Sequence, residues 1–262
     1  MAVDWQLFEA GPREAQRTVL LLPGGMCSAR SWLEVMQQPA LSRLRLVAAT
    51  LPGQAGAPPL DDSSVGAYGR TAAELVERTG ADVVVGFSMG ANVALEMVEH
   101  KLFAGPTVLL GVSLSAPDES ALFLTVVRVS RLLGTAPLAL AMRAAGSMVK
   151  SIPVSKQRQA ELAADFRRTS PRDVLPGLHE YLAWLRSGED HAAMLCASGV
   201  PAWVVHAEKG GDGGLTDTER RTLEACPTVR IVTIPGKVFF LPNEVPDRIA
   251  SVVNEAVAAV GT

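Results

Sequence analysis

The segment Gly86-Phe87-Ser88-Met89-Gly90 has the Gly-x-Ser-x-Gly spacing that presents a serine hydroxyl for nucleophilic chemistry. It follows an apolar run at 82–87 and precedes an amphipathic segment at 92–101, so we expect a sharp strand-to-helix turn there. The glycines allow close packing, and the turn would hold Ser88 in a strained conformation at the helix N-terminus. Its hydroxyl would then attack a carbonyl carbon. An ordinary glycine-flanked turn is the alternative interpretation.

A second glycine-rich segment, Leu22-Pro23-Gly24-Gly25-Met26, also follows an apolar run. Attack on a carbonyl creates an oxyanion, which backbone N–H groups stabilise. We predict that Gly25 or Met26 supplies one donor and that Met89, directly after the serine, supplies the other. A plain glycine-rich turn is again the alternative.

The elements that would position these groups follow from the hydrophobic pattern. Apolar runs that end near Gly, Pro or Ser predict buried strands at 18–22, 44–50, 82–87, 106–114, 201–206 and 230–234. Amphipathic segments at 65–78 and 92–101 predict helices between them, and the alternation favours a mostly parallel, doubly wound α/β sheet. Residues 3–8 alternate in polarity and predict an antiparallel edge strand.

The region from 118 to 188 breaks this rhythm. It has no strand-like run, but it has helical patterns at 121–133, 137–149, 155–168 and 173–186. A connection of this length must fold into something packed. We therefore predict an all-helical cap at 118–188, inserted into a core formed by residues 1–117 and 189–262.

Composition narrows the class of partner and the compartment. The 262 residues carry a formal net charge of −3, which argues against nucleic acid or an anionic membrane as a partner. The three cysteines are widely spaced, so neither a disulfide framework nor a zinc site is expected. There is no signal-peptide pattern and no apolar run long enough to cross a membrane. We expect a cytoplasmic protein that uses no metal and no cofactor.

Taken together, the motifs resemble the α/β-hydrolase superfamily, in the esterase and lysophospholipase-like branch with a helical cap. The resemblance spans nearly the whole chain and depends on Leu22-Pro23-Gly24-Gly25 with Ser31-Trp32, Leu51-Pro52-Gly53-Gln54-Ala55-Gly56, the Ser88 motif, Pro201-Ala202-Trp203-Val204-Val205-His206, and Ile234-Pro235-Gly236 with Phe240-Leu241-Pro242-Asn243-Glu244. It implies that Ser88 is a nucleophile that a histidine and an acid would activate.

The acid of that triad is displaced. In the family it lies in a Gly-x-x-Asp turn, whereas this chain reads Ala207-Glu208-Lys209-Gly210 and has glycine at the acid position. Asp212, two residues later, is one candidate. Asp118, after the preceding strand, is another, and in a third interpretation neither serves.

The family histidine is also missing. Phe239 stands where the resemblance places it, and no histidine follows His206. Gln54 and Pro23 replace two further histidines that are common in the family. His206 is then a candidate base, with a hydrogen-bonded, semi-buried side chain as the alternative, and Lys237 would need a strongly lowered pKa. The triad is therefore degenerate.

An apolar cavity is expected above Ser88, lined by Met26, Phe239, Phe240 and Trp184. His179 is a further candidate for this pocket. We expect His100 and His191 at the surface and Cys27 as a small buried apolar side chain.

The sequence thus favours an enzyme that acts on a small hydrophobic ester, lactone or thioester through Ser88. The missing base keeps a second class open, namely a non-hydrolytic lyase, cyclase or isomerase, or a small-molecule-binding protein that uses the same cavity. A homodimer through the cap or the edge strand stays open as well.

Overall fold

The computed structural model describes residues 3–209 and 214–261, and its centre is a seven-stranded sheet in the order β1-β3-β2-β4-β5-β6-β7. The strands are β1 (Leu7–Ala10), β2 (Thr18–Leu22), β3 (Arg45–Ala49), β4 (Val83–Phe87), β5 (Thr107–Leu110), β6 (Ala202–Lys209) and β7 (Val229–Lys237). Every neighbouring pair is parallel except β1 with β3. The predicted mostly parallel α/β sheet is confirmed.

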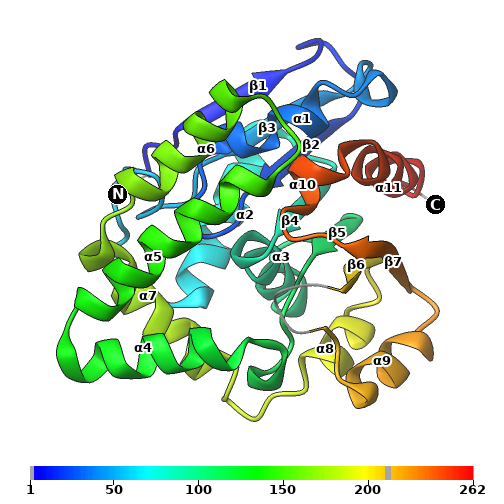
Figure 1. Cartoon of the computed structure of the whole chain (residues 1–262). Helices are drawn as coiled ribbons and strands as arrows, with labels where there is room; N and C mark the ends of the chain where they lie inside the picture. The colour runs from blue at the N-terminus through cyan, green and yellow to red at the C-terminus, as the bar shows by residue number, and fades with distance from the viewer. Residues whose placement is uncertain (1–2, 210–213, 262) are drawn as a thin grey trace.

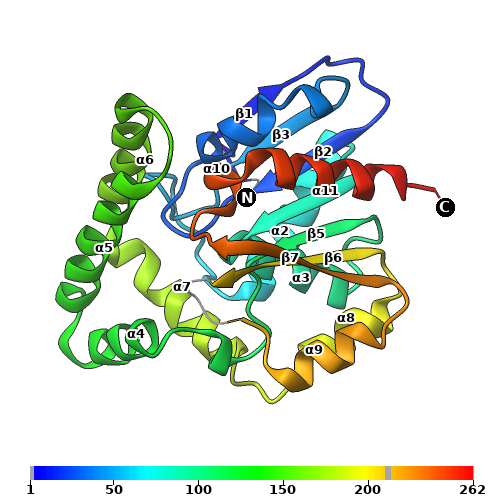
Figure 2. The same ribbon diagram turned by 45° about the vertical axis from the view of Figure 1, so that its right-hand side comes forward.

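Helices cover both faces of this sheet, which explains why its central strands are apolar throughout (Figures 1 and 2). One face packs against α2 (Val65–Thr79), α3 (Met89–Glu99), α8 (His191–Ser198) and α9 (Asp217–Glu224). The opposite face packs against α1 (Leu33–Met36), α10 (Leu241–Glu244) and α11 (Pro246–Ala258). The sheet is therefore a rigid platform for groups at its strand ends.

Several predicted boundaries differ from the structure, and three of the differences have a clear local cause. The edge strand lies at Leu7–Ala10 rather than 3–8, because it pairs only where β3 offers partners, from Ala49 back to Leu46. Strand β5 ends at Leu110 instead of 114, where Gly111 takes a positive φ of 59°. Helix α3 begins at Met89, three residues earlier than predicted, since the turn at Ser88 leads directly into it.

Of the α-helices described between β5 and β6, four extend beyond the carboxyl ends of the strands (Figure 2). They are α4 (Ala121–Leu133), α5 (Ala136–Met148), α6 (Lys156–Arg168) and α7 (Pro171–Trp184), close to the four predicted segments. We call them the cap helices. Within the described residues, no helix is long and apolar enough to span a membrane.

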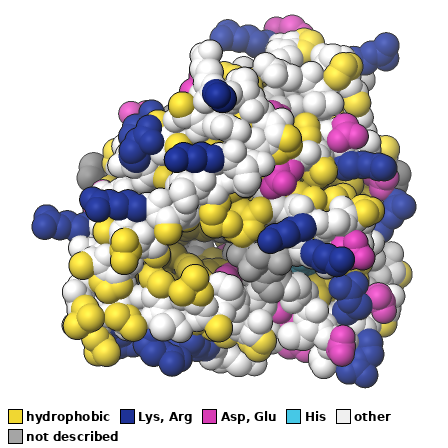
Figure 3. All heavy atoms as spheres, in the orientation of Figure 1, with side chains coloured by type: hydrophobic (Ala, Val, Ile, Leu, Met, Phe, Trp, Pro, Cys, Tyr) yellow, Lys and Arg dark blue, Asp and Glu magenta, His cyan; other side chains and the backbone are white. Residues whose placement is uncertain are grey.

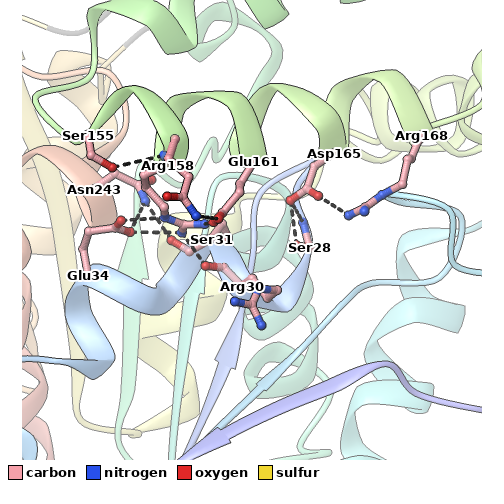
Figure 4. A network of polar contacts seen from close by, with 11 residues as sticks. Ser28, Arg30, Ser31, Glu34, Ser155, Arg158, Glu161, Asp165, Arg168 and Asn243 are labelled. Atoms are coloured by element: carbon pink, nitrogen blue, oxygen red, sulfur yellow. Dashed lines mark hydrogen bonds and ion pairs between the residues drawn. The ribbon is translucent and has the colours of Figure 1, made fainter.

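Helix α6 is fixed to the core by buried polar contacts (Figure 4). Arg158 Nε lies 2.7 Å from Glu34 Oε1, and both side chains are largely buried. The same guanidinium donates to the backbone carbonyl of Arg30, and Asn243 Nδ2 donates to Glu34 Oε2 at 2.7 Å. Removing one partner of such a buried pair leaves an uncompensated charge, so this end of the cap is held firmly.

Candidate functional site

Ser88 occupies a strained backbone conformation between β4 and α3. Its φ of 48° and ψ of −118° lie outside the regions that residues with a Cβ favour. The Ser88 N–H donates to the carbonyl of Leu110 at 2.8 Å, and its own carbonyl accepts from the N–H groups of Ala91 and Asn92. The strand-to-helix turn predicted from the motif is therefore present, and the surrounding hydrogen bonds impose it.

The flanking glycines permit this turn by close packing. A Cβ on Gly86 would lie 2.2 Å from the carbonyl oxygen of Gly90, and a Cβ on Gly90 would lie 2.3 Å from that of Leu22. No side chain fits either position. The motif therefore also fixes how closely α3 approaches β2 and β4.

Gly25 and Met89, the two expected oxyanion donors, lie close together. Gly25 lies beside Met89, since a Cβ on Gly25 would be 3.9 Å from the Met89 sulfur. The N–H groups of Gly25 and Met89 have no acceptor among the residues that the structure describes. The Met26 N–H, by contrast, donates to Gln54 Oε1 at 2.7 Å. Of the two alternatives predicted for the first donor, the Met26 N–H is therefore occupied and the Gly25 N–H has no acceptor among the described residues.

Cap helix α6 supports this loop and its neighbour from outside. Asp165 accepts from the backbone N–H of Ser28 at 3.0 Å and from its hydroxyl at 2.6 Å, and also pairs with Arg168 (Figure 4). Thr169 Oγ1 accepts from the N–H of Ala55, which has a positive φ of 48°. No pattern in the sequence predicts these contacts, because they join residues 114 to 137 positions apart.

Aromatic side chains fill the space beside the loop. Phe239 and Phe240 pack edge to face, with ring centroids 5.1 Å apart. Both belong to an apolar cluster that also contains Met26, Phe87 and Cys27. Burial raises the pKa of the Cys27 thiol to about 12, so this sulfur stays protonated. Ser88 Oγ has no hydrogen-bond partner among the described residues, and thus no base in contact.

Trp184 lies apart from that cluster. Its indole N–H donates to Glu96 at 2.9 Å, and its ring stacks on His191 with centroids 3.8 Å apart. The structure therefore gathers three of the four predicted pocket residues and separates the fourth.

His206 is buried beneath helix α9. On β6 it shares a face with Val204, which packs in the core on that side of the sheet. Burial and the nearby Arg220 lower the pKa of His206 to about 4, so the imidazole is neutral. The register runs from Phe87 to Leu110 to Val205, which puts His206 two strands from Ser88, roughly 10 Å at the Cα atoms. No hydrogen bond joins the two side chains.

Of the two candidate acids, the structure describes only Asp118. Asp212 lies outside the described residues. Asp118 is buried, and its Oδ2 accepts from the N–H groups of Leu114 and Ser115 at 2.7 and 3.0 Å. Burial, together with the neighbouring Glu219 carboxylate, raises the pKa of Asp118 to about 7. Its described partners are thus backbone groups and another carboxyl, with no imidazole among them.

The remaining candidates also lie away from the Ser88 hydroxyl. Lys237 is exposed at the end of β7. His179 lies on α7 with a buried Nε2 that has no described partner. The expected surface position of His191 is wrong: it is buried, and its Nδ1 lies 3.0 Å from both Glu99 oxygens. His191 is the first residue of α8 and faces α3. The periodicity of the sequence does not predict this orientation.

Space near the site is limited. A cavity of about 10 Å³, enough for one water molecule, is lined by Met89, Asn92, Tyr68 and Tyr181 among others. Figure 3 shows a hollow surrounded by hydrophobic side chains on the side of the cap helices. A larger groove of about 330 Å³ lies between α1 and α6, and both members of the Arg158–Glu34 pair line it.

Comparison with known proteins identifies the family. The sequence profile of the alpha/beta hydrolase family matches residues 19–251, so the chain belongs to this family. It is similar in structure to the esterase RhEst1 from Rhodococcus sp. ECU1013, with 18% identity, full coverage of both chains and a TM-score of 0.73.

Two further solved structures share the fold. An N-acyl homoserine lactonase has 14% identity and a TM-score of 0.74 over 99% of this chain and 98% of its own. A thioesterase domain from the curacin biosynthetic pathway has 20% identity and a TM-score of 0.64, over 97% and 100%. No curated protein sequence matches the chain.

Proposed function

We propose that this protein is an enzyme that cleaves small hydrophobic esters, lactones or thioesters through Ser88, with an altered triad. The observation that carries the proposal is the strained Ser88 backbone, with φ 48° and ψ −118°. Such strain persists only where the surroundings impose it, and it is characteristic of functional residues. The esterase, lactonase and thioesterase named above support the same range of substrates.

In the proposed reaction, Ser88 Oγ attacks the carbonyl carbon and the carbonyl oxygen becomes an oxyanion. The N–H groups of Gly25 and Met89 stabilise that charge, and each such donor contributes about 10²–10³ in rate. The alkoxide or thiolate leaves and takes up a proton, and water then hydrolyses the acyl-serine. With no base in contact, the Ser88 proton passes to hydroxide in solvent, so we expect acylation to be slow and to rise with pH.

The substrate side of the proposal depends on the apolar cluster of Met26, Phe239 and Phe240. These side chains would bind a short acyl or alcohol group without charge. We further propose that residues 118–188 form an inserted cap on a core of residues 1–117 and 189–262. The three free cysteines, which suit a reducing compartment, favour a cytoplasmic location.

A second candidate function follows from Phe239. An aromatic side chain at the base position removes the proton acceptor but leaves the two N–H donors intact. Such a site can stabilise an enolate in a lyase, cyclase or isomerase, or bind a carbonyl ligand without reaction.

A fluorophosphonate probe distinguishes the two. Wild type and Ser88→Ala are labelled and examined by intact mass, alongside turnover of p-nitrophenyl acetate and butyrate. We expect slow labelling of wild type only. Wild type that is folded yet unlabelled and inactive would overturn hydrolysis and direct the search to binding, by thermal-shift screening.

A further inference from the structure

The first two cap helices carry exposed aliphatic side chains. Among the large hydrophobic residues, those most exposed are Leu132 at 81%, Leu122 at 75%, Leu133 at 71% and Leu140 at 70%, all on α4 or α5. Leu132 and Leu133 end α4, and Leu140 lies in the second turn of α5, so three of the four flank the short connection between the two helices. In Figure 3 hydrophobic side chains gather at the corner where α4 leads into α5. A hydrophobic patch of this kind usually marks an interaction surface.

The charge of the same segment has one sign. Residues 121–150 contain Arg128, Arg131, Arg143 and Lys150 and no acidic residue, although the whole chain has a net charge of −3. All four basic side chains are exposed, and none has an ion pair among the described residues. They therefore form a local positive field next to the exposed leucines. The expectation against an anionic membrane rested on the net charge of the whole chain, which does not reveal this local field.

The two halves of the cap are attached differently. Helix α6 is held to the core through Arg158 and Asp165. Helices α4 and α5 instead meet their neighbours through small apolar clusters around Val127, Leu138 and Met142. The α4–α5 hairpin thus projects its tip away from the core, as Figure 2 shows.

We propose that the α4–α5 hairpin is a docking surface for an anionic lipid membrane. The leucines of the tip would enter the interface between headgroups and acyl chains, and Arg128, Arg131 and Arg143 would contact the lipid phosphates. This combination of exposed aliphatic and basic residues on helices is the one that binds interfaces without spanning them. It agrees with the finding that no described helix could cross a membrane. The inference does not depend on the chemistry at Ser88.

Vesicle co-sedimentation tests the proposal. We expect the full chain to bind vesicles with about 30% phosphatidylserine at least tenfold more tightly than pure phosphatidylcholine, because each basic residue near such a surface contributes about fivefold. The double variant Leu132→Ser/Leu133→Ser should lose this binding. Arg128→Gln/Arg131→Gln should lose the preference for anionic lipid, as should about 0.5 M salt.

The matched control is Leu7→Ser/Leu102→Ser, which changes two exposed leucines outside the cap and should bind like wild type. Circular dichroism confirms that each variant is folded. Wild type that ignores anionic vesicles, or a folded tip variant that still binds them, overturns the proposal. If wild type does not bind vesicles but is a dimer in light scattering, and the tip variant is a monomer, the patch binds a second copy of the chain instead.

Discussion

The backbone N–H of Met26 donates to the side-chain Oε1 of Gln54 at 2.7 Å, joining two loops that leave neighbouring strands. Met26 has a positive φ of 64°, a conformation that a Cβ disfavours, and Gln54 is buried. The side chain of Gln54 thus occupies the Met26 N–H, whereas the Gly25 N–H has no acceptor among the described residues. Gln54, which stands where histidine is common in the family, therefore helps to hold this loop in place.

Removal of that acceptor should weaken both fold and site. Gln54→Ala leaves a part-buried N–H without a partner, so we expect a loss of about 1 kcal/mol in the free energy of unfolding, measured in urea. If Gly25 is an oxyanion donor, p-nitrophenyl butyrate turnover should also fall. The exposed Gln37→Ala is the control and should change stability by less than about 0.5 kcal/mol. Equal stability of the two variants would contradict this role for Gln54.

The strain at Ser88 predicts an uncommon gain in stability. Ser88→Gly removes the Cβ from a residue with φ 48°, so we expect the protein to become about 1 kcal/mol more stable despite glycine's greater freedom when unfolded. Ser88→Ala keeps the Cβ and the strain, and should unfold at the same urea concentration as wild type. A Ser88→Gly variant that is less stable than Ser88→Ala would show that the turn is relaxed.

The aromatic side chain at the base position makes a gain of activity testable. Phe239→His would place an imidazole in the cluster that contains Met26 and Phe87, and general-base catalysis contributes about 10²–10⁴ in rate. We expect faster fluorophosphonate labelling of Ser88 and a new inflection near pH 6–7 in its rate. Phe240→His changes the adjacent, buried ring and serves as the control. If both variants label like wild type, position 239 does not face the hydroxyl.

The burial of His206 predicts acid sensitivity. Its folded pKa of about 4 lies below the ordinary 6.5, so between these values the unfolded chain binds a proton that the native state does not. Stability from this group is therefore complete above pH 6.5 and is lost as pH falls toward 4, by about 3 kcal/mol.

The titration of Asp118 changes the free energy of unfolding in the opposite direction. Because its folded pKa is raised from 3.8 to about 7, the stability that it contributes is lost as pH rises between these two values. The effect of His206 is therefore measured as a difference between wild type and His206→Leu, by urea unfolding at pH 7 and pH 4.5. We expect wild type to lose more stability than the variant. Parallel losses would mean that His206 is protonated in the native state.

The sequence by itself determined the framework. Apolar runs such as 83–87 and 18–22 are local and continuous, so they predict buried parallel strands without any knowledge of their neighbours. Gly86 and Gly90 likewise predict the turn at Ser88, because a sharp turn and close packing leave no room for a Cβ. The absence of a histidine after 206 was also visible in the sequence.

Only the tertiary structure decided which polar groups meet. The contacts of Gln54 with Met26 and of Asp165 with Ser28 join segments far apart in the chain, and no periodicity encodes them. The same holds for burial: His191, expected at the surface, is enclosed with Glu99, and the leucines at the α4–α5 tip face solvent. A pattern of residue types specifies one face of an element, whereas the surface that covers this face comes from elsewhere in the chain.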